Sequence, residues 1–448
     1  MKKRLIQGTA ILTTAGLFCK LLGFFYRIFL SHIIGAEGMG LYQLIFPVHN
    51  LCFAFSVGGI QTALSRMIAA SLGKKDSRSA QSIFLAGLFC SVSAACLLSV
   101  FLRHFSGFIS LHILKEPRCS VLLKILSLSL PLSAIHACTN GYFFARKETK
   151  VPAALQVGEQ LIRITSSFLI YLFFAKNQLE PSPMIAVFGL VCSEFSAMAL
   201  SLFFLTGDFH SRKISTASFH GCMVHLPEIF RLSFPITMNR VLLNLLHSTE
   251  AILIPWTLRR ANMAANDALS TFGILSGMSM PVILFPTAII NSMAAILLPA
   301  VAEEQAVGNQ KAILKLILNT VLYALLMGLS FWLLFLIFGN VLGNLMFHEK
   351  NAGNFIRTLS FICPFLYLNI TLSSILNGLG KTFTCFLINF LDLSVRILFL
   401  LLLIPVFGVK GYLYGLLTGE ILATIASSAA LAHFLRKDFS RQIKKDVL

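Results

Sequence analysis

Residues 151–175 read VPAALQVGEQLIRITSSFLIYLFFA, and residues 381–405 read KTFTCFLINFLDLSVRILFLLLLIP. Each stretch is long and apolar enough to cross a bilayer. Each also carries a carboxylate four residues before an arginine, Glu159 with Arg163 and Asp392 with Arg396, and the two pairs are 233 positions apart. Ionisable residues at bilayer depth cost about 3 kcal/mol each, so they usually face a bundle interior or an aqueous cavity. The repeated pair predicts two copies of one membrane unit with a polar interior.

The composition places the whole chain in the membrane class. Hydrophobic residues make up 56% of the 448 residues and charged residues only 12%, and the mean hydropathy is +0.82. Such values lie far outside those of soluble globular chains. We therefore predict an all-α integral membrane protein with about twelve transmembrane helices. The predicted spans are 5–31, 41–71, 79–101, 120–142, 151–175, 184–206, 227–255, 269–300, 313–337, 353–378, 381–405 and 409–434.

The 233-residue offset extends beyond the charged pairs. Pro131 and Pro364 share it, as do Gln156 and Asn389, while the run from Gly189 to Glu194 resembles the run 415–420 at an offset of 226. Six spans are an even number, so both copies enter the membrane from the same side. We predict two parallel six-helix repeats, an organisation typical of transporters that work by alternating access. The predicted parts are an N-terminal half 1–206, a cytoplasmic linker 207–226, a C-terminal half 227–434 and a basic tail 435–448.

The net charge of +18 is explained by membrane topology. With a cytoplasmic N-terminus, 20 of the 36 Lys and Arg residues fall in inner segments, eight in outer loops and eight in the spans. This bias follows the positive-inside rule and puts both termini in the cytoplasm. The inner basic segments suit anionic lipids of the cytoplasmic face. Nucleic-acid binding is then unnecessary as an explanation of the charge.

Several further polar residues fall inside predicted spans. Lys20 and Arg27 are seven residues apart in the first span, so they share one helical face. The seventh span has a polar stripe at helical spacing, and the second span adds a histidine and an arginine. These six residues are Arg240, Asn244, His247 and Glu250, then His49 and Arg66.

Structural roles compete with binding roles for these residues. Arg27 and Arg66 lie toward span ends and could snorkel to the headgroups. The two i,i+4 pairs could simply hold the bundle together, and His49, His136 and His247 could be hydrogen-bonded packing residues. Lys20 and Arg240 are the best ligand candidates, because they lie well inside their spans without a carboxylate at pairing distance on the same helix. The surplus of cations over anions in the spans suits a phosphate or carboxylate ligand.

Soluble-enzyme signatures are missing from the sequence. It has no phosphate-binding Gly-x-x-x-x-Gly-Lys-Ser/Thr loop and no Cys-x-x-Cys or His-Glu-x-x-His metal motif. The cytoplasmic loops are too short for a nucleotide-binding domain. We expect neither an enzyme nor a cofactor or metal requirement.

Three runs carry a resemblance to a known family. The runs Lys20-Leu-Leu-Gly-Phe-Phe-Tyr-Arg27, Gly35-Ala-Glu-Gly-Met-Gly-Leu-Tyr42 and Leu376-Asn-Gly-Leu-Gly-Lys381 resemble the stage V sporulation protein B family. So do Pro47, Asn140-Gly141 and Glu159-Gln-Leu-Ile-Arg163. That family belongs to the polysaccharide-flippase branch of the superfamily that also contains the multidrug and toxin extrusion transporters.

The resemblance implies export of an undecaprenyl-pyrophosphate-linked saccharide, such as a peptidoglycan precursor, from the inner to the outer leaflet of the bacterial cytoplasmic membrane. It also implies that basic residues of the first, second and seventh or eighth spans bind the pyrophosphate, which corresponds to Lys20, Arg27, Arg66 and Arg240. Relatives with this opening usually have fourteen spans. The two additional helices help to accommodate the lipid tail, so the predicted twelve leave that function unassigned.

Two other functions stay open at the level of sequence. A cation-coupled antiporter of drugs or metabolites would be expected to show unpaired acids in the N-terminal half, where the spans offer only Glu159 and Glu194. A non-transporting assembly factor of the spore envelope would tolerate loss of the intramembrane charges. The saccharide, the energy source and the oligomeric state are not specified by the sequence.

Overall fold

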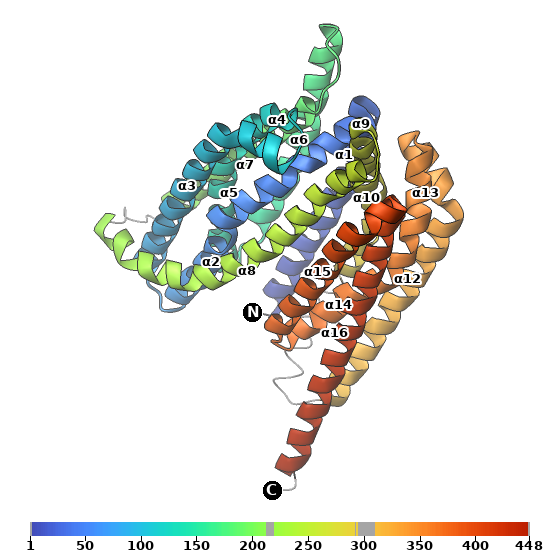
Figure 1. The fold of residues 1–448 in the computed structure, drawn as a ribbon. Coiled ribbons are helices and arrows are strands. Elements are labelled where there is room, and N and C mark those ends of the chain that lie inside the picture. Colours follow the sequence, from blue (N-terminus) through green and yellow to red (C-terminus); the bar gives the residue numbers. More distant parts are fainter. Residues whose placement is uncertain (1, 212–218, 292, 294–309, 447–448) are drawn as a thin grey trace. The chain divides into compact units, whose positions relative to one another are not determined.

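A computed structural model shows the chain as a set of helices (Figure 1). It describes the backbone of residues 2–211, 219–291, 293 and 310–446, and no strand occurs within those ranges. The side chains of Lys2 to Arg4, of Lys311 and of Arg436 onward, part of the predicted linker and the end of the predicted eighth span lie outside the described residues.

The helices fall into two packed units, Met1–Ile252 and Leu253–Leu448. The first unit contains α1 (Lys2–Phe53), η1 (Ala54–Gly58), α2 (Ile60–Gly73), α3 (Ser77–Phe108), η2 (Ile109–Ile113), α4 (Cys119–Leu126), α5 (Ser129–Ala145), α6 (Lys150–Lys176), α7 (Met184–Ser211) and most of α8 (Phe219–Arg260). The second contains the end of α8, then α9 (Ala265–Phe272), η3 (Gly273–Ser279), α10 (Met280–Leu284), α12 (Gln310–Phe347), α13 (Lys350–Leu359), η4 (Ser360–Ile362), α14 (Cys363–Gly378), α15 (Thr382–Phe407) and α16 (Val409–Asp446).

Eleven helical stretches of the described residues are long and apolar enough to cross a membrane. The first, Ala10–Gly73, is 64 residues long. It is interrupted at Gly35, where the backbone adopts φ 67° and ψ −177°, and its two arms correspond to the first two predicted spans. The prediction of a polytopic all-α membrane protein is confirmed.

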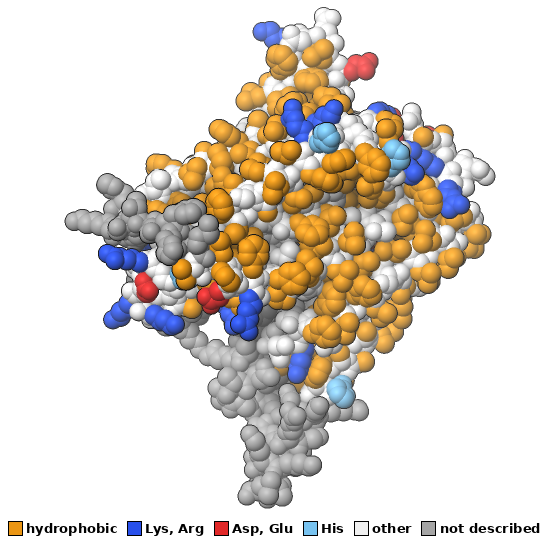
Figure 2. All heavy atoms as spheres, turned by 60° about the vertical axis from the view of Figure 1, so that its left-hand side comes forward, with side chains coloured by type: hydrophobic (Ala, Val, Ile, Leu, Met, Phe, Trp, Pro, Cys, Tyr) orange, Lys and Arg blue, Asp and Glu red, His pale blue; other side chains and the backbone are white. Residues whose placement is uncertain are grey.

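The outer surfaces of the helices are suited to lipid. On α12, Leu318, Leu322, Leu326, Leu329 and Leu333 are all exposed, and their spacing of three and four residues places them on one helical face. Hydrophobic side chains cover most of the face shown in Figure 2, whereas Lys and Arg lie mainly toward the top and the lower left of that view. Water cannot solvate backbone groups in the hydrocarbon layer, so the continuous helices satisfy them internally.

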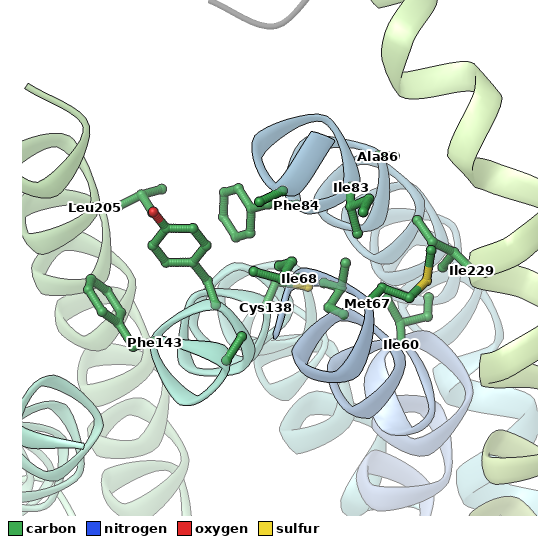
Figure 3. Packing of buried hydrophobic residues seen from close by; sticks show 14 residues of the cluster. Ile60, Met67, Ile68, Ile83, Phe84, Ala86, Cys138, Phe143, Leu205 and Ile229 are labelled. Atoms are coloured by element: carbon green, nitrogen blue, oxygen red, sulfur yellow. The ribbon is translucent and has the colours of Figure 1, made fainter. Parts of the chain in front are cut away.

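Each unit has its own apolar core. In the first unit, buried side chains of α2, α3, α5 and α7 pack together, with Ile68, Phe84 and Phe143 almost completely enclosed (Figure 3). In the second unit the corresponding cluster includes Ile375 and Ala423, from α14 and α16. The cores fix the helices that carry the intramembrane charges.

An ion-pair network outside the predicted spans joins α1 to the segment before α4. Arg118, in the segment before α4, donates from Nε to Glu116 Oε1 at 2.7 Å and from Nη1 to Glu37 Oε1. Hydrogen bonding to Glu116, then to Glu37, raises the pKa of Arg118 above its ordinary value. The network attaches the second arm of α1, just after the Gly35 break, to the loop that precedes α4.

The boundary between the units lies inside α8. Residues up to Ile252 pack with the first unit and those from Leu253 with the second, although the helix is continuous from Phe219 to Arg260. Ser248 Oγ donates to the carbonyl oxygen of Pro47 on α1 at 3.0 Å, so most of the predicted seventh span packs on N-terminal helices. The sequence-based division between residues 206 and 227 stays a prediction about the repeats.

Candidate functional site

A network of charges lies between α14, α15 and α16 of the second unit. Arg396 donates from Nε to Asp392 Oδ1 at 2.9 Å, and its Nη2 lies 2.8 Å from Asp392 Oδ2 and 2.6 Å from Glu420 Oε1. Asn369 Nδ2 donates to the other oxygen of Glu420 at 3.3 Å, and Ser427 Oγ donates to Asn369 Oδ1 at 3.3 Å. Asp392 is 7% exposed and Glu420 is 4% exposed. We call these five residues the C-terminal polar cluster.

The first unit has a matching network between α5, α6 and α7. Arg163 pairs through Nη2 with Glu159 Oε1, and its Nε donates to Ser193 Oγ at 3.2 Å. His136 Nε2 lies 3.9 Å from Glu159 Oε2, and its Nδ1 is hydrogen-bonded to Ser201 Oγ at 3.3 Å. Glu194 of α7 interacts electrostatically with Glu159 and Arg163. His136, Glu159, Arg163, Glu194 and Ser201 form the N-terminal polar cluster.

The two clusters are related by the sequence offsets. The offset of 233 pairs His136 with Asn369, Glu159 with Asp392 and Arg163 with Arg396, and the offset of 226 pairs Glu194 with Glu420 and Ser201 with Ser427. Two contacts recur at these positions: each arginine pairs with the carboxylate four residues before it, and each serine is hydrogen-bonded to the side chain at position 136 or 369. Sequence reasoning did not include His136, Asn369, Glu194 or Glu420 among the site residues, although the shared offsets were the signal that could have found them.

The first arm of α1 packs against α6 beside the N-terminal cluster. Cys19 Sγ donates to the Gln156 carbonyl oxygen at 3.5 Å, and the Tyr26 hydroxyl is hydrogen-bonded to Ser167 Oγ at 2.8 Å. Lys20 and Arg27 each follow one of these contact residues, so each emerges about 100° further around the helix. The two cations therefore lie on one strip of α1 that flanks its seam with α6.

Arg240 of α8 contacts α2 at a second location, one helical turn before Arg66. Arg240 Nη2 donates to Thr62 Oγ1 at 3.3 Å, and Arg66 is one helical turn after Thr62. A Cβ atom added at Gly59 would lie 2.9 Å from the backbone nitrogen of Thr237, so only glycine allows α8 to approach this closely. No hydrogen bond or ion pair among the described residues joins Arg66 or Arg240 to Lys20 or Arg27.

The four predicted ligand cations share one property. Lys20, Arg66 and Arg240 are exposed, Arg27 is half-buried, and none of the four forms an ion pair within the described part of the chain. Arg27 lies within electrostatic range of Tyr42. Arg163 and Arg396, by contrast, are held by carboxylates. Arg163 and Arg396 are thus neutralised within the protein, whereas a ligand-binding role for the other four cations stays a prediction.

The other predicted polar residues have contacts within the protein. His49 is buried and hydrogen-bonded through Nε2 to Ser129 Oγ at 2.9 Å, which favours a packing role. Asn244 Nδ2 donates to the carbonyl oxygen of Arg240 at 2.8 Å. His247 has a 60% exposed side chain and lies 3.8 Å from the buried Glu250. Asn244, His247 and Glu250 all lie on α8, the helix that carries Arg240.

The fold and the intramembrane charges define a multi-pass membrane protein of the transporter class. Its helices span the cell membrane, and the ion pairs Glu159–Arg163 and Asp392–Arg396 lie within two of the candidate spans. The chain belongs to the polysaccharide biosynthesis protein family, which matches residues 5–305. Family and fold together indicate a flippase or exporter rather than an enzyme.

Known relatives agree with this assignment. The chain is 23% identical to stage V sporulation protein B of Bacillus subtilis (strain 168) over 438 residues, covering 97% of this chain and 85% of that protein. It is 24% identical to the lipid II flippase MurJ of the same organism over 187 residues, 39% of this chain and 34% of that protein. An inward-facing multidrug resistance MATE family transporter of the MOP superfamily shares the fold, with a TM-score of 0.75 at 15% identity over 96% of this chain and 99% of that structure.

Proposed function

We propose that this protein moves an undecaprenyl-pyrophosphate-linked saccharide, such as a peptidoglycan or spore-cortex precursor, from the inner to the outer leaflet by alternating access. The observation that carries the proposal is a set of four cations that form no ion pair with any residue the structure describes: Lys20 and Arg27 on α1, Arg66 on α2 and Arg240 on α8. The family membership and the partial likeness to a lipid II flippase support the same class of cargo.

The chemistry of the cations matches a pyrophosphate. An uncompensated cation at membrane depth costs about 3 kcal/mol, so it gains from an anionic ligand. A guanidinium stays charged in a low-dielectric site and presents paired donors to phosphate oxygens, while Lys20 supplies a compact charge. A cationic drug would instead be repelled by this set. The pyrophosphate is therefore the cargo group that these side chains favour.

Transport can be driven by the membrane potential. With the cell interior negative, outward movement of an anion is favoured by about 2.3 kcal/mol per charge per 100 mV. The cations neutralise the pyrophosphate while it crosses, the saccharide occupies the hydrated interior, and the polyprenyl chain stays in lipid. Rocking of the helical repeats then exposes the head group outside.

The test is a leaflet assay in proteoliposomes with a fluorescent polyprenyl-pyrophosphate saccharide. Charge-assisted hydrogen bonds contribute about 1.5–3 kcal/mol, so Lys20→Ala and Arg240→Gln should each slow transport by roughly 10- to 100-fold. Lys176→Ala, an exposed change at the end of α6, should transport at the wild-type rate. Transport by the two site variants at the wild-type rate, with normal membrane insertion, would disprove this site assignment.

The same assay separates the alternative functions. A cation-coupled antiporter would move cationic dyes instead of the lipid-linked saccharide, and its activity would not depend on Lys20 or Arg240. A non-transporting assembly factor would move neither cargo. Either result would replace the proposed function.

A further inference from the structure

The two polar clusters have the same plan but differ in how completely their acids are satisfied. In the C-terminal polar cluster both oxygens of Glu420 have partners, Arg396 Nη2 and Asn369 Nδ2. In the N-terminal polar cluster, Arg163 Nε donates to Ser193 instead of a second carboxylate. The position corresponding to Ser193 is Gly419, where an added Cβ would lie 3.0 Å from Arg396 Cγ. Gly419 offers Arg396 no hydroxyl, and Arg396 hydrogen-bonds to the carboxylates of Asp392 and Glu420. Arg163 instead uses its Nε for Ser193.

Two buried acceptors in the N-terminal cluster region are left without donors. Glu194 Oε2 is inaccessible to solvent and has no hydrogen-bond partner, and the same holds for Asn140 Oδ1. Asn140 belongs to this region because its Nδ2 lies 2.9 Å from His136 Nε2. Buried polar atoms are nearly always hydrogen-bonded, and an unsatisfied carboxylate oxygen in an apolar surrounding is especially costly. Neither oxygen has a hydrogen-bond donor among the residues that the structure describes.

The titratable groups around Glu194 are few. From α6, Glu159 and Arg163 lie within electrostatic range of it, and His136 of α5 lies 3.9 Å from Glu159. The groups that α1 places within electrostatic range of Arg163 or Glu159 are Cys19, Tyr26, Tyr42 and His49. Two carboxylates and one guanidinium leave one negative charge in excess, and a single proton would neutralise the cluster.

We propose that Glu194, together with Glu159 and His136, forms a proton-binding site in the first unit and that its occupancy is coupled to transport. The coupling half of this inference rests on the proposed function, whereas proton binding does not. One proton adds to a carboxylate oxygen from the outer aqueous phase and leaves to the cytoplasm, while the anionic cargo moves outward. No other bond forms or breaks.

The donor chemistry favours a proton over a metal ion. Within the described residues no group of three or more His, Cys, Asp and Glu side chains is arranged to hold a metal ion, and the adjacent Arg163 would repel one. The C-terminal cluster has Asn369 where this one has His136, and an amide, unlike an imidazole, does not gain a proton near neutral pH. The C-terminal cluster has the same two carboxylates and one guanidinium, but both oxygens of Glu420 there have partners. Among the described residues of the two clusters, Glu194 Oε2 is the carboxylate oxygen left to accept a proton.

Proton binding can be measured without cargo. Infrared difference spectra of the purified protein in lipid nanodiscs, taken between acidic and alkaline buffer, should show the carbonyl band of a protonated carboxyl group. Glu194→Gln should remove this band. Glu420→Gln, the matched change in the other cluster, should leave it in place. Absence of the band in the wild type, or its persistence in Glu194→Gln, would overturn the proton site.

Coupling is tested with the fluorescent lipid-linked saccharide in proteoliposomes at zero membrane potential. If one proton moves per cycle, each unit of pH gradient should change the steady-state ratio of outer to inner cargo by about tenfold. Glu194→Gln should abolish this dependence, Glu194→Asp should preserve it, and Glu180→Gln in the loop after α6 should behave as wild type. If the wild-type ratio of outer to inner cargo does not change with the pH gradient, the proposed coupling is overturned. A normal infrared band without any lipid movement refutes the proposed function while leaving the proton site intact.

Discussion

Replacing Arg396 with methionine removes the cation of the C-terminal polar cluster and leaves two buried carboxylates facing each other. Three contacts of 2.6–2.9 Å to Asp392 and Glu420 are lost. Removing one partner of a buried ion pair typically costs about 3–5 kcal/mol, mainly because the remaining charge is left uncompensated. Asp392 is 7% exposed and Glu420 4% exposed, so water can solvate the two remaining carboxylates only slightly. We therefore expect the free energy of unfolding to fall by about 3–5 kcal/mol.

The measurement is equilibrium unfolding in mixed micelles, with SDS as denaturant and circular dichroism as the probe. The triple variant Arg396→Met, Asp392→Asn, Glu420→Gln should recover most of the lost stability, because no buried charge remains. Arg163→Met should cost less than Arg396→Met, because the side chains of Arg163 and Glu159 are 22% and 19% exposed against 11% and 10% for Arg396 and Asp392. If Arg396→Met lowered stability by less than about 1 kcal/mol, as for a solvent-exposed pair, the assignment of a desolvated cluster would be wrong.

Two glycine substitutions test the backbone geometry by the same unfolding measurement. Gly59→Ala should lower the free energy of unfolding by about 1–3 kcal/mol through overpacking against α8 at Thr237. Gly73→Ala, where an added Cβ meets nothing within 4 Å, should not destabilise the protein. Equal effects of the two substitutions would contradict the close approach of α8 to Gly59. Gly35→Ala should cost about 1–2 kcal/mol because φ is +67° there, and Gly16→Ala, in the helical part of α1, should be neutral or stabilising by up to about 1 kcal/mol. A stabilising Gly35→Ala would show that the break in α1 is not present.

The spans and the polar interior could be predicted because the membrane imposes simple rules. About 20 apolar residues are needed to cross the hydrocarbon layer, and a charged residue within them has few acceptable surroundings. Glu159, Arg163, Asp392 and Arg396 were therefore visible as a repeated feature before any contact was known. Their structural partners follow from the same offsets once the packing of the helices is fixed.

The remaining features depend on contacts between helices, which sequence periodicity does not record. The packing of α8 with the first unit follows from the space at Gly59 and from the bond between Ser248 and Pro47, and neither leaves a periodic pattern. Orphan oxygens such as Glu194 Oε2 are a property of three-dimensional packing. The π-helical segments, such as η1, are likewise set by tertiary contacts, since Ser91 Oγ donates to the Ser56 carbonyl oxygen at 2.7 Å.

The boundary between the units at Ile252 and Leu253 has a mechanical consequence, because it falls in a helix instead of a loop. The covalent link between the units is α8 itself, and Pro255 lies two residues beyond the boundary. Proline lacks an N–H group and clashes with the preceding turn, so the helical ladder is interrupted there. Within the described residues around the division, the backbone therefore passes from one unit to the other through a helix that lacks one of its hydrogen bonds. A bend in α8 is easiest at this point.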